Sequence, residues 1–123
     1  MTYIPEQENT VLWVAESSFQ PHGGLKSHAH DYYQLFLVRE GPQKYSVGDE
    51  ERILEAGESV LAKPNVLHGM ENMSDEVCRC YEVKFTISAP RLEALLTTLP
   101  PFFPKDDFVS GLVRELVAES TCA

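Results

Sequence analysis

The sequence predicts a mainly β fold, in which a small barrel of short strands is followed by two C-terminal α-helices. Up to residue 87, short runs of aromatic and branched residues are separated by turn signals, as in β-sandwiches and barrels. After Ser88 the spacing of the leucines changes to a helical period. A chain of 123 residues has the length of one domain with a buried core. We therefore expect one domain over residues 1–123.

The predicted strands lie within residues 10–87, after a polar segment, residues 1–9, that we expect to be a mobile arm. Turns containing glycine or proline separate the strands. In the last strand, the face with Tyr81 and Val83 is predicted to look into the barrel, so that Cys78 and Cys80 lie under a helix or face solvent. The expected strands are residues 11–15, 32–39, 44–47, 52–54, 59–62, 68–70 and 77–87.

Two amphipathic helices are predicted in residues 88–120. Ser88 is the candidate cap of the first helix and Pro90 lies in its first turn, whereas Asp106 or Asp107 starts the second helix. Their apolar stripes either pack on the barrel wall or pair with a second subunit. The stripes consist of Leu92, Leu95, Leu96 and Leu99, and then of Phe108, Leu112, Val113, Leu116 and Val117.

The overall composition argues against several classes of function. The formal net charge is −9 and no Lys/Arg cluster is present, so this chain is not expected to bind DNA or RNA by itself. No run has the length of a transmembrane helix, and residues 1–6 lack the pattern of a signal peptide. The three cysteines do not form an even disulfide framework. A cytoplasmic protein that does not bind membranes is the expectation.

Three of the four histidines form the most informative pattern in the chain. His28, His30 and Gln34 have the same parity, so an unbroken strand would point them in one direction. A fold that closes on itself would bring His68 alongside them. Three imidazoles and one side-chain oxygen suit a divalent ion such as zinc, nickel, iron, manganese or copper. Alternatively, these histidines bind no metal and hydrogen-bond a ligand or one another.

Four further residues are candidates for ligand binding. Tyr32 and Phe36 share the parity of the histidines and could stack on a sugar or an aromatic molecule, or be plain core. Trp13, near the arm, is equally ambiguous. Arg79 shares the parity of Tyr81, and an inward arginine needs a carboxylate or an anionic ligand. The alternative for Arg79 is a position at the barrel mouth, where it reaches solvent.

These residues resemble the two motifs of the cupin superfamily, whose fold is a double-stranded β-helix, or jelly roll. The first motif is matched by His28, His30, Gln34 and Gly41, with Gln34 at the position where the family has a glutamate. The second motif is matched by Gly57, Pro64, His68 and Asn72, although Pro64 lies one place late and a glycine before the histidine is missing. With Gln34 all four ligands are neutral, which should weaken metal binding and favour metals that prefer imidazole over manganese.

The segments HDYYQLFLVREG and LAKPNVLHG also resemble the N-terminal sensing domain of AraC-type transcription regulators. The resemblance implies a barrel that holds a small effector, such as a sugar or another polar metabolite, and helices that form a homodimer. It implies that residues 88–120 dimerise through Leu92, Leu95, Leu96, Leu99, Phe108, Leu112 and Leu116. No helix-turn-helix is present, so the chain is expected to be a fragment of a longer regulator that contacts DNA through a domain absent from this chain.

A non-enzymatic sensing and dimerisation domain is therefore the first functional hypothesis. Its rival is a metal-dependent cupin enzyme, a dioxygenase or an isomerase, because three protein imidazoles leave open positions on a metal. Gln34 in place of the acid, and the lack of another convincing acid or base in the set, argue against the enzyme. A free-standing cupin that binds a metabolite is the third hypothesis.

Overall fold

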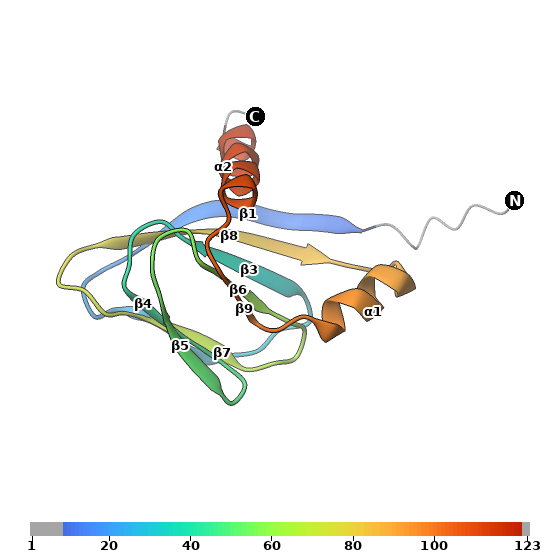
Figure 1. Cartoon of the computed structure of the whole chain (residues 1–123), viewed down its shortest axis with the longest axis horizontal. Helices are drawn as coiled ribbons and strands as arrows, with labels where there is room; N and C mark the ends of the chain where they lie inside the picture. The colour runs from blue at the N-terminus through green and yellow to red at the C-terminus, as the bar shows by residue number, and fades with distance from the viewer. Residues whose placement is uncertain (1–8, 122–123) are drawn as a thin grey trace, which may run out of the picture.

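Two antiparallel β-sheets face each other and form the body of the protein (Figure 1). The computed structural model describes residues 9–121. One sheet contains, in spatial order, β1 (Thr10–Phe19), β8 (Cys78–Thr86), β3 (Tyr33–Val38), β6 (Ser59–Ala62) and β9 (Phe102–Phe103). The other contains β2 (Gly24–His28), β7 (His68–Asn72), β4 (Gln43–Val47) and β5 (Glu50–Leu54). Two helices follow the barrel strands, α1 (Pro90–Thr98) and α2 (Asp107–Thr121). The predicted mainly β fold with two C-terminal helices is confirmed.

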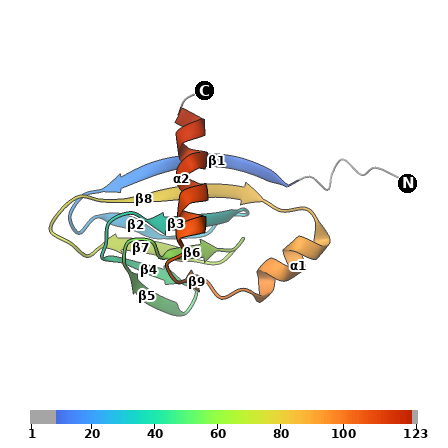
Figure 2. The same ribbon diagram turned by 45° about the horizontal axis from the view of Figure 1, so that its top comes forward.

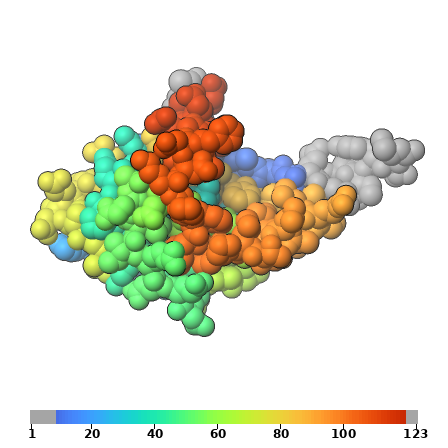
Figure 3. Space-filling model, in the orientation of Figure 1, coloured from blue at the N-terminus to red at the C-terminus, as the bar shows by residue number. Residues whose placement is uncertain are grey.

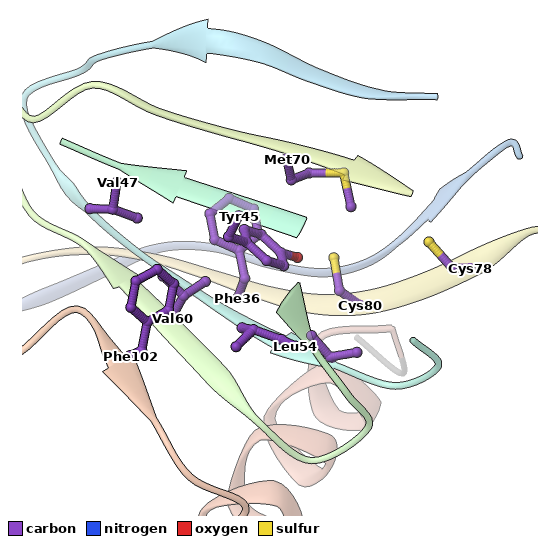
Figure 4. Close-up of a cluster of buried hydrophobic side chains, with 10 residues drawn as sticks. Phe36, Tyr45, Val47, Leu54, Val60, Met70, Cys78, Cys80 and Phe102 are labelled. Carbon is purple, nitrogen blue, oxygen red and sulfur yellow. The ribbon is translucent and has the colours of Figure 1, made fainter. Parts of the chain in front are cut away.

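The main core lies between the two sheets, where side chains from both inner faces interdigitate (Figure 4). Phe36 and Tyr45 come from opposite sheets, and their ring centroids are 5.2 Å apart. A second cluster lies on the outer face of the five-stranded sheet, where Val113 of α2 packs against Leu37 and Val83. Strand β3 is therefore buried on both faces, as its run of apolar residues predicts.

The predicted orientation of strand β8 is wrong. The register pairs Glu82 with Phe36 and Cys80 with Val38, so these β8 residues line the interior together with Cys78. Tyr81 and Val83 lie on the outer face, beneath α2. Alternation separated the two faces of this strand correctly but could not say which is inside. The outer face is as apolar as the inner one because helix α2 packs on it.

No unbroken strand runs through His28, His30 and Gln34, so their common parity does not place them on one face. His28 ends β2 in one sheet, and Gln34 belongs to β3 in the other. His30 lies in the connection between the two strands. Strand β2 escaped prediction because its sequence, GLKSH, has no apolar alternation, and the two-residue strand β9 follows directly after a Pro-Pro break.

The helix ends differ slightly from the prediction. Helix α1 begins with Pro90 at its first position, but its cap residue is Ala89 rather than Ser88 and provides no side-chain cap. Asp106 caps α2 as expected, because its Oδ1 accepts a hydrogen bond from the Val109 backbone N–H at 3.0 Å. Residues 1–8 of the expected arm lie outside the described residues.

Helix α2 crosses the outer face of the five-stranded sheet and continues past its edge strand β1 (Figure 2). Val113 and Val117 face the sheet and are buried, whereas Phe108, Leu112 and Leu116 are exposed. In the space-filling view α2 projects from the body of the molecule (Figure 3). Among residues 9–121, neither helix has the length and hydropathy needed to cross a lipid bilayer.

Candidate metal centre

His28, His30 and His68 converge at one end of the space between the sheets. One nitrogen from each ring lies within 4.8 Å of the others. The ring centroids of His28 and His68 are 4.4 Å apart, and those of His30 and His68 are 4.7 Å apart. His68 is 2 % exposed, whereas His28 and His30 are partly exposed. The cluster is therefore anchored in the core and open to solvent on one side.

Backbone carbonyls orient all three rings in the same way. In each ring Nδ1 lies within hydrogen-bond distance of a carbonyl oxygen two residues away, that of Lys26 at 2.7 Å, Tyr32 at 3.2 Å or Val66 at 3.1 Å. A carbonyl oxygen only accepts, so Nδ1 has the proton in each ring and Nε2 keeps a free lone pair. Metal-binding histidines in proteins are held in this way.

Nε2 of His68 shows whether these residues fit a metal. It is buried and has no hydrogen-bond partner among the described residues. Burial lowers the pKa of His68, and the neighbouring imidazoles lower it further, so the ring stays neutral and its lone pair is available. An unpaired buried acceptor costs about 1–3 kcal/mol. A divalent cation bound by the three Nε2 atoms would satisfy it, so the residues fit a metal.

Gln34 completes the predicted set of four. Its Oε1 lies 2.8 Å from Nε2 of His30. When Nδ1 donates to the Tyr32 carbonyl, a neutral His30 ring turns an Nε2 acceptor toward this oxygen, so two acceptors face each other at close range. Two such atoms repel unless they share a cation. The predicted ligands His28, His30, Gln34 and His68 are thus brought together from both sheets.

Glu82 is the site residue that sequence reasoning missed. It is 5 % exposed, and its Oε1 accepts a hydrogen bond from Nε2 of Gln34 at 2.6 Å. Its Oε2 accepts a second hydrogen bond, from the Ser17 hydroxyl. Glu82 comes from β8, and the parity prediction places it on the outer face of that strand, away from the histidines. The pairing of β8 with β3 is the signal that would have found it.

Three of the four predicted ligand-binding residues lie near the histidines. The Tyr32 ring stacks on His30 with centroids 3.8 Å apart, and Phe36 lies 6.1 Å from the His68 ring. The ammonium group of Lys84 lies 4.5 Å from the Trp13 ring centroid and 5.7 Å from that of Tyr32. Lys84 pairs with Gln34 in the sheet, so these residues form one mouth beside the metal centre.

Arg79 is not part of this group. Its parity places it on the face of β8 opposite Glu82, not on the predicted inward face. The side chain is 42 % exposed, and its Nε lies 3.6 Å from a carboxylate oxygen of Glu40. The expected inward position fails for the same reason as the orientation of β8.

The two buried cysteines lie in the main core and are not part of the histidine cluster. Burial raises the pKa of the Cys80 thiol well above its usual range, and the Glu82 carboxylate raises it further. Burial, with a contribution from Glu40, also raises the pKa of Cys78. Both side chains pack among apolar residues and act as small core residues.

Comparison with known proteins agrees with this geometry. The model of the family described as "Cupin domain" matches residues 15–84, more than half of the chain. This chain belongs to the cupin family. The expected cupin fold is thereby confirmed, and both histidine motifs lie inside the matched segment.

One curated relative of this cupin is the H2HPP isomerase of Bacillus subtilis. The two sequences are 37 % identical over 72 residues, which represent 58 % of this chain and 30 % of the relative. The chain thus spans less than a third of that protein. This relative is an isomerase and not an AraC-type regulator, so the predicted resemblance to regulators receives no support from it.

Solved structures show the same cupin architecture at low sequence identity. A predicted oxalate decarboxylase from Thermotoga maritima superimposes with a TM-score of 0.59 at 14 % identity, covering 63 % of this chain and 68 % of that one. The cupin domain of Schizosaccharomyces pombe Cnp3 gives 0.58 at 10 % identity, covering 70 % and 69 %. At these identities the likeness concerns the fold alone.

The remaining cupin motif residues have structural roles here. Gly57 has φ = 90°, a conformation that favours glycine. A Cβ added to Gly41 would lie 2.7 Å from the Leu54 carbonyl oxygen. Asn72 is fully buried, and its Nδ2 lies within 3.2 Å of the carbonyl oxygens of Phe19, Gln20 and Glu76. These residues shape turns between the strands.

Proposed function

We propose that this protein is a metal-dependent cupin enzyme of the isomerase class that acts on a small carboxylate-bearing metabolite. The observation that carries the proposal is the convergence of three imidazoles whose Nδ1 atoms are all bound to backbone carbonyls. Each Nε2 is free to bind a metal. The 37 % sequence identity to an isomerase over 72 residues supports the reaction class. The rival hypothesis from the sequence therefore becomes the leading one.

His28, His30, His68 and Gln34 would hold the metal, a first-row divalent ion such as zinc, nickel, iron, manganese or copper. A divalent cation with open positions supplies Lewis-acid polarisation of a carbonyl oxygen. The chain's own residues would position the substrate. The partly exposed His28 and His30 give access from the mouth, and the buried side of the cluster excludes water.

Lys84 indicates the charge of the substrate. Its ammonium group lies beside the Trp13 and Tyr32 rings and forms no ion pair with a carboxylate in the described part of the chain. Beside the mouth, a cavity of about 450 Å³ runs between the barrel and α1, next to Tyr32. An anionic group of the substrate would pair with Lys84 while its carbonyl faces the histidines. We therefore favour small 2-oxo acids as the first substrates to test.

The test is proton exchange at the carbon next to the carbonyl. Protein loaded with Co²⁺ is incubated with a panel of 2-oxo acids in D₂O, and deuterium incorporation is followed by ¹H NMR. We expect metal-dependent exchange that His68→Ala abolishes. Lys84→Met should raise KM about tenfold or more through the loss of a charge-assisted contact, and Lys84→Arg should retain most of the affinity. Absence of exchange in metal-loaded protein would refute the isomerase proposal.

A second candidate is supported by the exposed helices. Leu95 of α1 is 65 % exposed and Phe108 of α2 is 75 % exposed. An apolar cavity of about 340 Å³ lies between the helices and the outer face of the five-stranded sheet. Leu96, Phe103 and Val109 help to line it. A second copy covering this surface would bury it. The candidate function is the effector-sensing and dimerisation domain of an AraC-type regulator, with DNA contacted by another domain.

Sedimentation velocity tests this candidate. We expect a homodimer at micromolar concentration that becomes a monomer in Leu95→Lys/Phe108→Lys, without loss of secondary structure. Arg91→Glu, an exposed charge change on α1, serves as the control. A monomeric parent protein would refute the dimerisation surface. Dimerisation together with metal-dependent exchange would favour the enzyme over the sensing domain.

A further inference from the structure

We propose that Glu82 is a positioning residue of the metal centre that acts through Gln34. It holds the Gln34 amide with Oε1 toward the histidines and supplies the negative charge that the four neutral ligands lack. This inference rests on the proposed metal centre and deepens it. It assigns to a residue of β8 the task that the family's acid performs at the position of Gln34.

The hydrogen bonds around Glu82 define its state and its orientation. Oε1 accepts from Nε2 of Gln34 at 2.6 Å, and Oε2 accepts from the Ser17 hydroxyl. Both oxygens of the side chain thus face groups that can donate a hydrogen bond. A carboxylate can accept only from the amide N–H, so Gln34 must point its Oε1 the other way, toward Nε2 of His30. The orientation of the amide is therefore set by Glu82.

The charge of Glu82 is otherwise unbalanced. The side chain is 5 % exposed, yet it forms no ion pair with a Lys, Arg or His side chain within residues 9–121. A buried carboxylate without a cation is unfavourable. Through the Gln34 amide the carboxylate is linked to the centre formed by His30, His68 and the Gln34 oxygen. A divalent cation there would compensate the charge, with one amide between them.

The amide can transmit the charge as well as the orientation. A short hydrogen bond from the Gln34 N–H to a carboxylate polarises the amide and increases the negative charge on its oxygen. That oxygen becomes a better ligand for a hard divalent cation. Partners of this kind behind a ligand change metal affinity by about 10- to 100-fold. The Gln34–Glu82 pair thus places a negative charge directly behind a neutral ligand.

A purely structural role is the alternative. Through Ser17 the carboxylate also connects β1 to β8, and this contact could be its whole purpose. The two roles differ in what they predict for metal affinity. Ser17→Ala removes the contact with β1 and keeps the carboxylate, whereas Glu82→Gln keeps the shape and removes the charge.

The experiment measures the Kd for Co²⁺ by isothermal titration calorimetry, with the visible spectrum of bound Co²⁺ as a second readout. Glu82→Gln should weaken binding about 10- to 100-fold and alter the spectrum. Glu50→Gln removes the same charge from an exposed position of β5 and should change Kd less than about threefold. Ser17→Ala should also stay within about threefold of the parent, because the carboxylate remains.

A charge relocation completes the test and does not depend on the stability of Glu82→Gln alone. The double variant Gln34→Glu/Glu82→Gln keeps the hydrogen bond between the two positions and moves the charge directly onto the ligand. We expect its affinity for Co²⁺ to equal or exceed that of the parent. If the double variant stays as weak as Glu82→Gln, the role of the charge is overturned.

The remaining outcomes separate this inference from the metal centre itself. A parent protein that binds Co²⁺, with an unchanged Kd in Glu82→Gln, overturns the role of Glu82 and leaves the metal centre intact. Weak binding in Ser17→Ala together with Glu82→Gln would assign the effect to the link between strands and also overturns it. A parent protein that binds no divalent metal overturns both proposals.

Discussion

The two ends of β7 hold buried polar side chains that differ in one respect. At one end, Asn72 and its neighbour Gln43 on β4 have partners for their amide groups. At the other end, His68 has a buried Nε2 without a partner. Both residues belong to motif-like positions and both are almost fully buried. Sequence position and burial are therefore alike, and the hydrogen-bond partners distinguish a residue that stabilises the fold from one that can bind a ligand.

The difference follows from the cost of burying polar atoms. A satisfied amide network stabilises the turns it connects, and a missing partner costs about 1–3 kcal/mol. An unpaired buried polar atom is tolerated where a bound ligand supplies the partner. The end of β7 with Asn72 is therefore expected to control stability, and the end with His68 is expected to control binding.

The largest expected effect is on stability, from Asn72→Ala. This change removes a fully buried amide that links the turn after β1 to the turn after β7 and that donates to three carbonyl oxygens. We expect a loss of about 3 kcal/mol or more in the free energy of unfolding, measured by urea denaturation. Met73→Ala, at an exposed neighbour, should change it by less than about 1 kcal/mol. Similar values for both variants would contradict the structural role of Asn72.

His68→Ala should mainly weaken metal binding and have a smaller effect on stability. Loss of one imidazole of three is expected to weaken Co²⁺ binding at least 100-fold, about 2.7 kcal/mol, measured by calorimetry. The free energy of unfolding without metal should fall by less than in Asn72→Ala, because the removed Nε2 had no partner. A large loss of stability without loss of metal affinity would reverse the comparison between the two ends.

A smaller effect is expected at Gln43, where a double-mutant cycle tests the satisfied network. Gln43→Leu leaves the buried Tyr45 hydroxyl without its acceptor and should cost about 2 kcal/mol. Tyr45→Phe removes this hydroxyl. It should therefore lower the free energy of unfolding less in the Gln43→Leu variant than in the parent protein. Urea denaturation of all four proteins measures this coupling. Strict additivity would show that the hydroxyl does not depend on Gln43.

The smallest expected effect is the pH dependence of stability without metal. Burial lowers the pKa of His68 in the folded state, so below about pH 6.5 the unfolded chain binds a proton that the folded protein does not. Stability should therefore decrease as the pH falls from about 6.5 toward the lowered pKa. His68→Ala should flatten this part of the curve, measured by denaturation in a chelator. An unchanged slope would show that His68 does not titrate as described.

Much of the fold and of the candidate site could be predicted from local patterns. Strand β6 has its predicted bounds, and β3 and β8 differ from prediction by a residue at each end, because runs of branched and aromatic residues between turns define strands well. The ligand set could be predicted because histidines and a carboxamide at motif spacing are rare by chance. β2 was missed because a polar edge strand has no such pattern.

The sequence by itself determined the mainly β class, the two C-terminal helices and the four candidate ligands, because these depend on spacing along the chain. Only the tertiary structure decided that His28 and Gln34 come from different sheets, since a strand break leaves their parity unchanged. It also decided that Glu82 faces inward. Both faces of β8 are covered, one by the opposite sheet and one by α2, so hydrophobicity could not identify the inner face.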